Sequence, residues 1–156
     1  MELGSIFTVA GDGGSGFNGD GIPATSARVN GPFGPVMDPV GNLYFADAAN
    51  HRVRKIDALS GLISTVAGTG TAGYNGDWRA PASAQLWGPI GVGLDAACRM
   101  YVVEFNGSRV RRLEPAELTA VASMVPDPGA VGSSLTVGVT VTNIWTATIT
   151  GVMVAM

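Results

Sequence analysis

At 156 residues the chain is long enough for one sizeable core or two small ones, and its 46% apolar content is ordinary for a folded protein. A net charge of −3 and a pI near 4.9 argue against a nucleic-acid-binding protein, which usually carries a basic surface. The 23 glycines indicate many short strands joined by tight turns, and the single cysteine, Cys98, cannot form an internal disulfide.

The N-terminal part of the chain predicts a run of short elements. A strand is expected at residues 6–10, a glycine-rich loop at 11–21 and a single helical turn with proline at its start at 23–29. After the break at Gly31-Pro32, four short strands are expected at residues 33–38, 43–47, 52–57 and 62–67. Four strands with tight connections are typical of an antiparallel blade.

The chain then repeats itself. Residues 63–114 align with residues 6–57 without a gap, at a shift of 63 − 6 = 57 residues, and 20 of the 52 aligned pairs are identical. Unrelated sequences of this composition would share about four identities in such an alignment. Tandem copies of a four-stranded unit predict a β-propeller.

The stretch GNLYFADAANHRVRKID resembles an NHL repeat, and the unit ISTVAGTGTAGYNGD…ASAQLWGPIGVGLD is similar to the long NHL repeats of bacterial propeller proteins. The resemblance covers roughly residues 5–114. It implies a ring of about six blades, of which this chain supplies one full and one incomplete four-stranded blade. We therefore expect residues 1–114 to be a propeller fragment, with Met1 not the natural start.

Residues 115–156 have a different character. Valines alternate with threonine and glycine from Val137 to Val141, which predicts a strand rather than a membrane-spanning helix. Pro126-Asp127-Pro128, Gly132 and LTVGVTVTN resemble the opening strands of the prokaryotic Ig-like repeat domain known as domain of unknown function eleven, and the pattern departs at Ile144-Trp145. The resemblance implies a truncated Ig-like β-sandwich segment, so the expected fold class is all-β throughout.

A glycine motif with the spacing Gly-x-Gly-x-x-Gly, typical of dinucleotide-binding turns, follows the first expected strand. It occupies Gly11, Gly13 and Gly16, and recurs at Gly68, Gly70 and Gly73. No helix is expected after either copy, because Phe17 to Gly21 are turn-forming residues and YNGD follows the second copy. We interpret the glycines as structural turns and expect no cofactor.

Asp12, Asn18 and Asp20 in the same loop suggest calcium. The loop does not match an EF-hand, because Gly14 and Gly16 occupy two ligand positions when it is counted from Asp12. Asn-Gly-Asp is also a common turn sequence, so a structural turn is preferred and calcium binding is left open.

Basic residues recur on the third strand of each repeat, at residues 52–55 and 109–112. Arg52 and Arg54 alternate along the strand and are expected to form a solvated face. Asp47 with Arg52, and Glu104 with Arg109, are expected to be cross-hairpin ion pairs that contribute no more than about 1 kcal/mol each.

Few residues suggest catalysis. His51 is the only histidine, has Ser108 at the equivalent position and is expected to lie in a hairpin turn. A propeller enzyme of the metal-dependent lyase or lactonase type would need acids or histidines at the channel ends of several inner strands. The expected inner strands offer only Asp38 and Asp95, next to turns at their far ends.

We therefore expect a non-enzymatic binding or scaffold module of a bacterial secreted or surface protein, although no signal peptide is recognised in this chain. A propeller enzyme is the alternative. The expected partner is a protein or a carbohydrate, and exposed strand edges predict either missing chain or self-association. The candidate interaction residues are Asn18, Asp20, Asn75, Asp77, Trp78 and Trp87. For the two tryptophans, packing is preferred over a role as ligand platforms.

Overall fold

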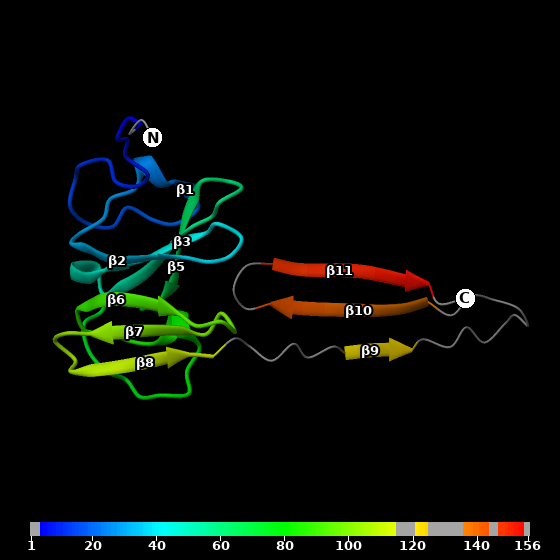
Figure 1. Cartoon of the computed structure of the whole chain (residues 1–156). Coiled ribbons are helices and arrows are strands. Elements are labelled where there is room, and N and C mark those ends of the chain that lie inside the picture. The colour runs from blue at the N-terminus through cyan, green and yellow to red at the C-terminus, as the bar shows by residue number, and fades with distance from the viewer. Residues whose placement is uncertain (1–3, 115–120, 125–135, 144–146, 155–156) are drawn as a thin grey trace, which may run out of the picture. The chain divides into compact units, whose positions relative to one another are not determined.

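The computed structural model describes residues 4–114, 121–124, 136–143 and 147–154, with side chains described up to residue 114 (Figure 1). The chain divides into two compact units, Met1–Leu113 and Glu114–Met156. The described strands of both units pair antiparallel, so the fold class is all-β as the sequence predicts.

The first unit contains two sheets that follow the repeat. Blade 1 comprises β2 (Pro32–Met37), β3 (Leu43–Asp47), β4 (Arg52–Ile56) and β5 (Leu62–Ala67), with the short β1 (Ile22–Pro23) added beside β5. Blade 2 comprises β6 (Pro89–Leu94), β7 (Met100–Glu104) and β8 (Arg109–Leu113) in that order. The single 3-10 turns are η1 (Ala24–Ser26), η2 (Ala48–Asn50) and η3 (Pro81–Ser83).

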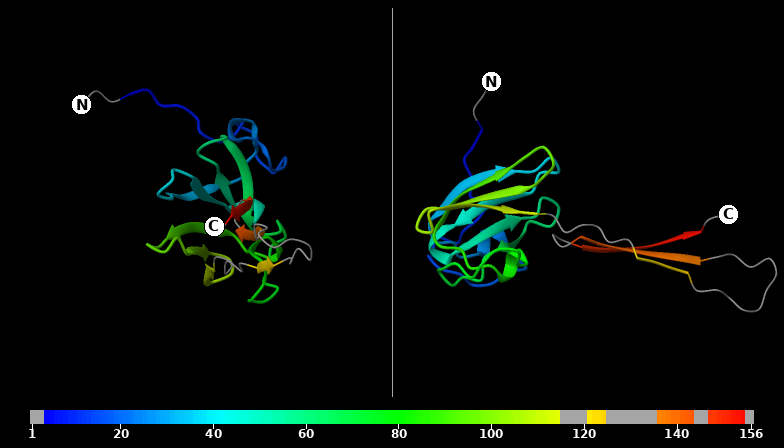
Figure 2. Two further views of the ribbon diagram at one scale, coloured as in Figure 1. Left: turned by 90° about the vertical axis from the view of Figure 1, so that its right-hand side faces the viewer. Right: turned by 90° about the horizontal axis from the view of Figure 1, so that it is seen from below.

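Both sheets confirm the expected blade. The four strands predicted between residues 33 and 67 form one antiparallel sheet with neighbouring strands adjacent in sequence. β6, β7 and β8 begin 57 residues after β2, β3 and β4. β2 and β6 lie next to each other, so the two blades stand side by side within the unit (Figures 1 and 2).

The expected strand at residues 6–10 is wrong for this structure. The segment has no regular structure, and Ile6, Phe7 and Val9 are exposed. Its counterpart in the second copy is β5, which is held by pairing with β4. Within residues 4–114, no strand lies alongside residues 6–10, and an isolated strand has no partner for its backbone hydrogen bonds.

The helical turn expected at residues 23–29 is shorter than predicted. It forms the single 3-10 turn η1, which Pro23 precedes. The buried face of η1 and the residue that follows it packs on blade 1, where Ala24 and Ala27 contact Phe45 and Ile63. This cluster attaches the glycine-rich loop to the sheet.

The second unit is a three-stranded antiparallel sheet of β9 (Val121–Met124), β10 (Thr136–Asn143) and β11 (Ala147–Val154), in the order β11-β10-β9. The period-two pattern is confirmed as a strand at β10. The residues Pro126 to Pro128, Gly132 and Ile144-Trp145 lie outside the described part, so the Ig-like assignment stays a prediction. Over the described residues, no helix reaches the length and apolar character needed to cross a membrane.

Candidate functional site

The two glycine-rich loops follow the same path. Gly11 donates its N–H to the carbonyl of Ala24 at 3.0 Å, and Gly68 donates to Pro81 at 3.0 Å. Positive φ angles of 98° and 95° at the two glycines match as well. Each loop closes on a 3-10 turn, not on the α-helix that a dinucleotide site requires, which is the geometry that the turn interpretation predicts.

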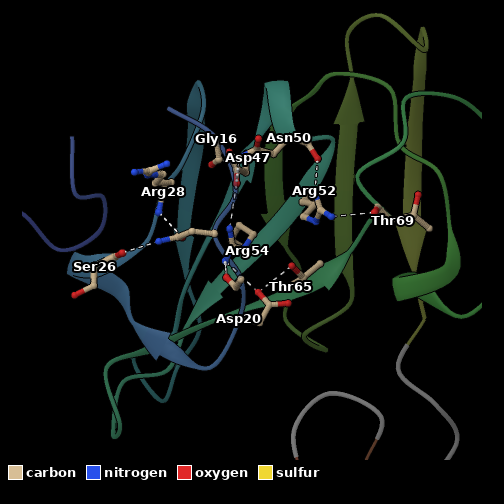
Figure 3. A network of polar contacts seen from close by, with 12 residues as sticks. Gly16, Asp20, Ser26, Arg28, Asp47, Asn50, Arg52, Arg54, Thr65 and Thr69 are labelled. Carbon is tan, nitrogen blue, oxygen red and sulfur yellow. Dashed lines mark hydrogen bonds and ion pairs between the residues drawn. The ribbon is translucent and has the colours of Figure 1, made fainter. Parts of the chain in front are cut away.

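A buried arginine fastens the first loop to blade 1. Arg54 of β4 is fully buried and contacts Asp47 Oδ2 at 3.2 Å through Nη1. Its Nη2 reaches across to the loop, donating to Gly19 O and Asp20 Oδ1 at 3.0 Å each (Figure 3). The ring of Phe17 lies 4.8 Å from the Arg54 guanidinium. Residues more than 30 positions apart are thus joined by one side chain.

Asp47 anchors the same network from its other side. Both of its oxygens accept hydrogen bonds from the Asn50 amide, and Oδ1 also accepts the Asn30 N–H at 2.7 Å. The Asn50 amide continues to Gly16 O at 2.6 Å (Figure 3). The buried carboxylate therefore has an arginine, the Asn50 amide and the Asn30 N–H around it, which compensates its charge.

The second copy repeats this arrangement at a shift of 57 residues. Arg111 contacts Asp77 at 3.1 Å and Glu104 at 3.6 Å, and it also donates to Gly76 O at 3.1 Å. Tyr74, the counterpart of Phe17, lies 5.3 Å from the Arg111 guanidinium. We call each set the loop latch. Its members are Phe17, Asp20, Asp47 and Arg54 in the first copy and Tyr74, Asp77, Glu104 and Arg111 in the second.

The expectation that Arg52 and Arg54 form a solvated face is wrong. Arg54 is enclosed because the glycine-rich loop covers that face of β4. Arg52 is half-buried against Phe17, with its guanidinium 3.9 Å from the ring, and it donates to Thr69 O in the second loop. The second loop is thereby bonded to the first residue of β4 in blade 1.

The expected ion pairs are also corrected. Asp47 does stand opposite Arg52 in the sheet register, but its ion pair is with Arg54, the diagonal neighbour. Arg52 Nη1 instead donates to Asn50 O. In the second copy Glu104 faces Arg109 in register and pairs with Arg111 in the same way.

The candidate polar residues of the loops are bonded internally. Asn18 accepts the N–H of Arg28 and donates to Ser26 O. Its counterpart Asn75 accepts from Gln85 and donates to Ser83 O in the same manner. Asp20 and Asp77 belong to the loop latches. The four side chains give the loops their shape, and their role in binding a ligand stays a prediction.

The loop carboxylates that suggested calcium binding are also paired within the protein. Asp12 accepts the Gly14 N–H at 2.7 Å and lies 3.5 Å from Arg28, and Asp20 faces Arg54. Across residues 4–114, no three His, Cys, Asp or Glu side chains gather in a group that could hold a metal ion. Each loop carboxylate therefore has a cationic side chain of the protein as its partner.

Trp78 does not pack, contrary to the preferred interpretation. Its side chain is 99% exposed, and its backbone has φ +61°. The first copy has Gly21 at this position with φ +72°. A residue with a Cβ is strained in this region, so the chain keeps the glycine conformation while carrying its largest side chain there.

Two further aromatic residues stand where the first copy has small or polar ones. Trp87 replaces Asn30 and Phe105 replaces Ala48. Phe105 is 71% exposed, whereas Trp87 is 46% exposed and so about half-covered by the protein. They are neighbours, because Phe105 N–H donates to Gly88 O and Gly107 N–H donates to Trp87 O. Phe105 was missed in the sequence interpretation, although comparing the two repeat copies position by position reveals it.

The expected turn position of His51 is confirmed. The residue follows η2 with φ 53°, and Ser108 has φ 47° at the equivalent place. His51 Nδ1 accepts the N–H of Gly88 at 3.2 Å, which joins the turn of blade 1 to the start of β6. The histidine therefore connects the two blades.

The two inner-strand acids are held in turns. Asp38 accepts hydrogen bonds from the backbone of Val40 and Asn42, the Asn42 amide and the Tyr44 hydroxyl. Burial raises the pKa of Asp38, but these bonds outweigh it and the pKa lies below the usual value. Asp95 has the equivalent bonds, and its pKa is likewise lowered.

The lowered pKa predicts a pH-dependent stability contribution. Asp38 stabilises the fold fully above the carboxyl pKa of the unfolded chain, about 4, and this contribution is lost as the pH falls through the lower folded pKa. We expect Asp38→Asn to destabilise the protein more at pH 7 than at pH 3, as measured by urea unfolding. A difference between the two proteins that is constant with pH would contradict this.

Comparisons with known proteins find relatives that are much longer than this chain. No family model matches the chain. A stretch of 95 residues is 32% identical to the protein SUPPRESSOR OF QUENCHING 1, chloroplastic, of Arabidopsis thaliana, and covers 61% of this chain and 9% of that protein.

Three solved structures from Bacteroides thetaiotaomicron resemble the chain, each at 28% identity. A protein of unknown function aligns with TM-score 0.60 over 66% of this chain and 26% of its own. An auxiliary nutrient binding protein aligns with TM-score 0.55 over 68% and 28%. A putative phosphatase aligns with TM-score 0.56 over 67% and 25%. The chain thus spans about a quarter of each solved structure.

These neighbours are propeller-like proteins, and they agree with the blades seen here. The first unit is part of a β-propeller. It holds one full four-stranded blade and three strands of another.

Proposed function

We propose that this chain is a non-enzymatic binding module built from NHL-type propeller blades, in a secreted or surface protein of a bacterium. Its ligand is a carbohydrate held by the aromatic side chains of the second repeat. The neighbour described as a nutrient binding protein supports a binding role. The observation that carries the proposal is Trp78, a fully exposed ring on a strained backbone.

The strain argues for a use of the side chain. A non-glycine residue in the left-handed region costs about 1–3 kcal/mol. Trp78 recovers none of this by burial, because its ring is 99% exposed. Glycine, which the first copy has at this position, would avoid the cost. A large flat ring in solvent offers stacking area with few rotatable bonds, which suits a sugar ring.

The loop latch fixes the backbone from which this ring projects. Asp77, directly before Trp78, is bonded to Arg111 of β8 and to the Tyr74 hydroxyl. The loop is therefore attached to the sheet through Asp77, the residue directly before Trp78. A preorganised platform loses less conformational entropy on binding than a mobile one.

The enzymatic alternative needs groups that can exchange protons or hold a metal. Asp38 and Asp95, the acids that the sequence offered, have their oxygens occupied by turn hydrogen bonds and their pKa lowered. A carboxylate with a lowered pKa is a weaker general base. The comparison with a putative phosphatase gives the alternative its support, and the binding role is our preference.

The variant Trp78→Gly tests the proposal. We expect at least a tenfold loss of affinity for whichever of cellohexaose, maltohexaose and xylohexaose the wild type binds by calorimetry. Unfolding free energy should be unchanged or higher by about 1 kcal/mol, since the strain is removed and nothing is unburied.

The control is Leu59→Ser, which removes an equally exposed apolar side chain from a turn of blade 1. It should bind as the wild type does. The proposal fails if the wild type binds none of the three oligosaccharides, or if Trp78→Gly binds as tightly as the wild type.

A further inference from the structure

The segment of residues 6–10 has the sequence of a blade strand without a sheet. IFTVA matches ISTVA at residues 63–67 in four of five positions, and those residues lie in β5. In β5 the side chains of Ile63, Val66 and Ala67 are buried. In the N-terminal segment Ile6 is 100% exposed. The isoleucine and the valine of this sequence are therefore buried in one copy and exposed in the other.

Both segments lead into loops that are held by equivalent backbone hydrogen bonds. The first hydrogen bonds after them are equivalent, from Gly11 N–H to Ala24 O and from Gly68 N–H to Pro81 O. Asp12 and Thr69 then donate to Ala27 O and Ala84 O at 2.9 and 3.0 Å. Residues 6–10 thus emerge from a backbone that is already shaped to continue into a fourth strand.

Blade 2 presents the matching edge. β8 pairs with β7 and has no other neighbour among the described strands, whereas its counterpart β4 carries β5. Val110 of β8 is 67% exposed, while its counterpart Val53 is buried. The two strands read RVRRL and RVRKI, so β8 offers nearly the same surface as the strand that holds ISTVA.

The free segment and the free edge lie at opposite ends of the first unit. Blade 1 stands between residues 4–10 and β8 (Figure 1). Ala10 also packs against the buried cluster of blade 1, which fixes the end of the segment there.

We propose that residues 6–10 of one copy of this chain add to β8 of a second copy as the fourth strand of blade 2. The register follows from β4 and β5, where Ile56 faces Ile63, Arg54 faces Thr65 and Val53 faces Ala67. Transferred by 57 residues, Ile6 faces Leu113, Thr8 faces Arg111 and Ala10 faces Val110. Each copy donates one strand and accepts one, so copies join head to tail.

One polar contact supports this register independently of the apolar residues. In blade 1 the Thr65 hydroxyl donates to Asp20 Oδ1 at 3.1 Å (Figure 3). The counterparts are Thr8 and Asp77. Strand addition brings the Thr8 hydroxyl of one copy to the Asp77 carboxylate of the other, completing the second latch as the first is completed.

Light scattering after size exclusion tests the association. The full chain of 15.9 kDa is expected to show a mass above that of the monomer. The fraction of associated chains should rise with protein concentration. Val9→Asp should weaken the association at least tenfold, because its counterpart Val66 is buried. Phe7→Asp is the matched control, because its counterpart Ser64 is only half-buried, and it should have a smaller effect.

Cysteine trapping tests the register. With the exposed Cys98 replaced by serine, Ile6→Cys in one preparation and Leu113→Cys in another should form a mixed disulfide when combined. Phe7→Cys combined with Leu113→Cys should cross-link several-fold less. A wild type that stays monomeric at all concentrations, an association that Val9→Asp leaves unchanged, or equal cross-linking by both pairs would each overturn the proposal.

Discussion

Replacing Arg54 by methionine is expected to lower the free energy of unfolding by about 3–5 kcal/mol, the range for breaking a buried ion pair on one side. Asp47 is fully buried and would keep its charge without the guanidinium that now faces it. The carbonyl of Gly19 would lose this donor, and the carboxylate of Asp20 would keep only the Thr65 hydroxyl. The glycine-rich loop would then keep its contacts with η1, Asn50 and Thr65 and the stacking of Phe17 on Arg52.

The second loop latch supplies the matched control. Arg111→Met removes the equivalent side chain, but Arg111 is 13% exposed and its contact to Glu104 is longer, 3.6 Å. Asn50 has glycine as its counterpart, Gly107, so Glu104 Oε1 has no hydrogen-bond partner in the first unit even in the native protein. We expect a smaller loss, about 1–2 kcal/mol, because solvent replaces part of the interaction.

Urea unfolding followed by tryptophan fluorescence measures both losses. Adding Asp47→Asn to Arg54→Met should recover part of the stability, since the uncompensated charge is removed. If Arg54→Met costs less than about 1 kcal/mol, or if the two arginines cost the same, the buried first latch is not the stronger one.

The blades could be predicted from the sequence because the repeat has no gap. In a single copy, turn residues mark the ends of strands only ambiguously. Here the same turn positions recur 57 residues later, which confirms where each strand ends. The expected strands at 33–38, 43–47 and 52–57 match β2, β3 and β4 within about two residues. A strand's presence, by contrast, depends on a neighbour, and residues 6–10 show the correct pattern without one.

The burial of Arg54 could not be read from alternation along β4. Whether a face of a strand meets solvent depends on what covers it, and the cover here is a loop some 34 residues earlier in sequence. A signal was nonetheless present, because Asn-Gly-Asp and Arg-Val-Arg are identical in both copies. Two motifs retained together in a diverged repeat are candidates for contact, and here they do touch.

The exposure of Trp78 could not be predicted from the sequence. Tryptophan in a loop usually covers apolar surface, so packing was the reasonable expectation. The repeat alignment places it at the position of Gly21, but a backbone angle is not visible in sequence. Only the structure shows that the position needs φ > 0 and that the ring faces solvent.

Gly68→Ala is expected to lower the free energy of unfolding by about 3 kcal/mol or more, since strain and a backbone overlap add together. Gly68 has φ +95°, and a Cβ there would overlap the carbonyl oxygen of His51. That oxygen belongs to the turn of blade 1, so relief requires the second loop to move away from the blade. Gly11→Ala separates the two effects, because Gly11 has φ +98° and its Cβ would meet only a Val29 methyl at 3.5 Å.

Gly11→Ala should therefore cost about 1 kcal/mol, the strain alone. Urea unfolding of the two variants gives the difference directly, and the slope with denaturant should stay that of the wild type if the same surface unfolds. Equal losses of unfolding free energy would show that the second loop can move away from the His51 carbonyl at little cost. A loss at least about 2 kcal/mol larger for Gly68 would place the contact between the second loop and the blade 1 turn among the rigid parts of the repeat, because a rigid backbone cannot accommodate the added methyl group.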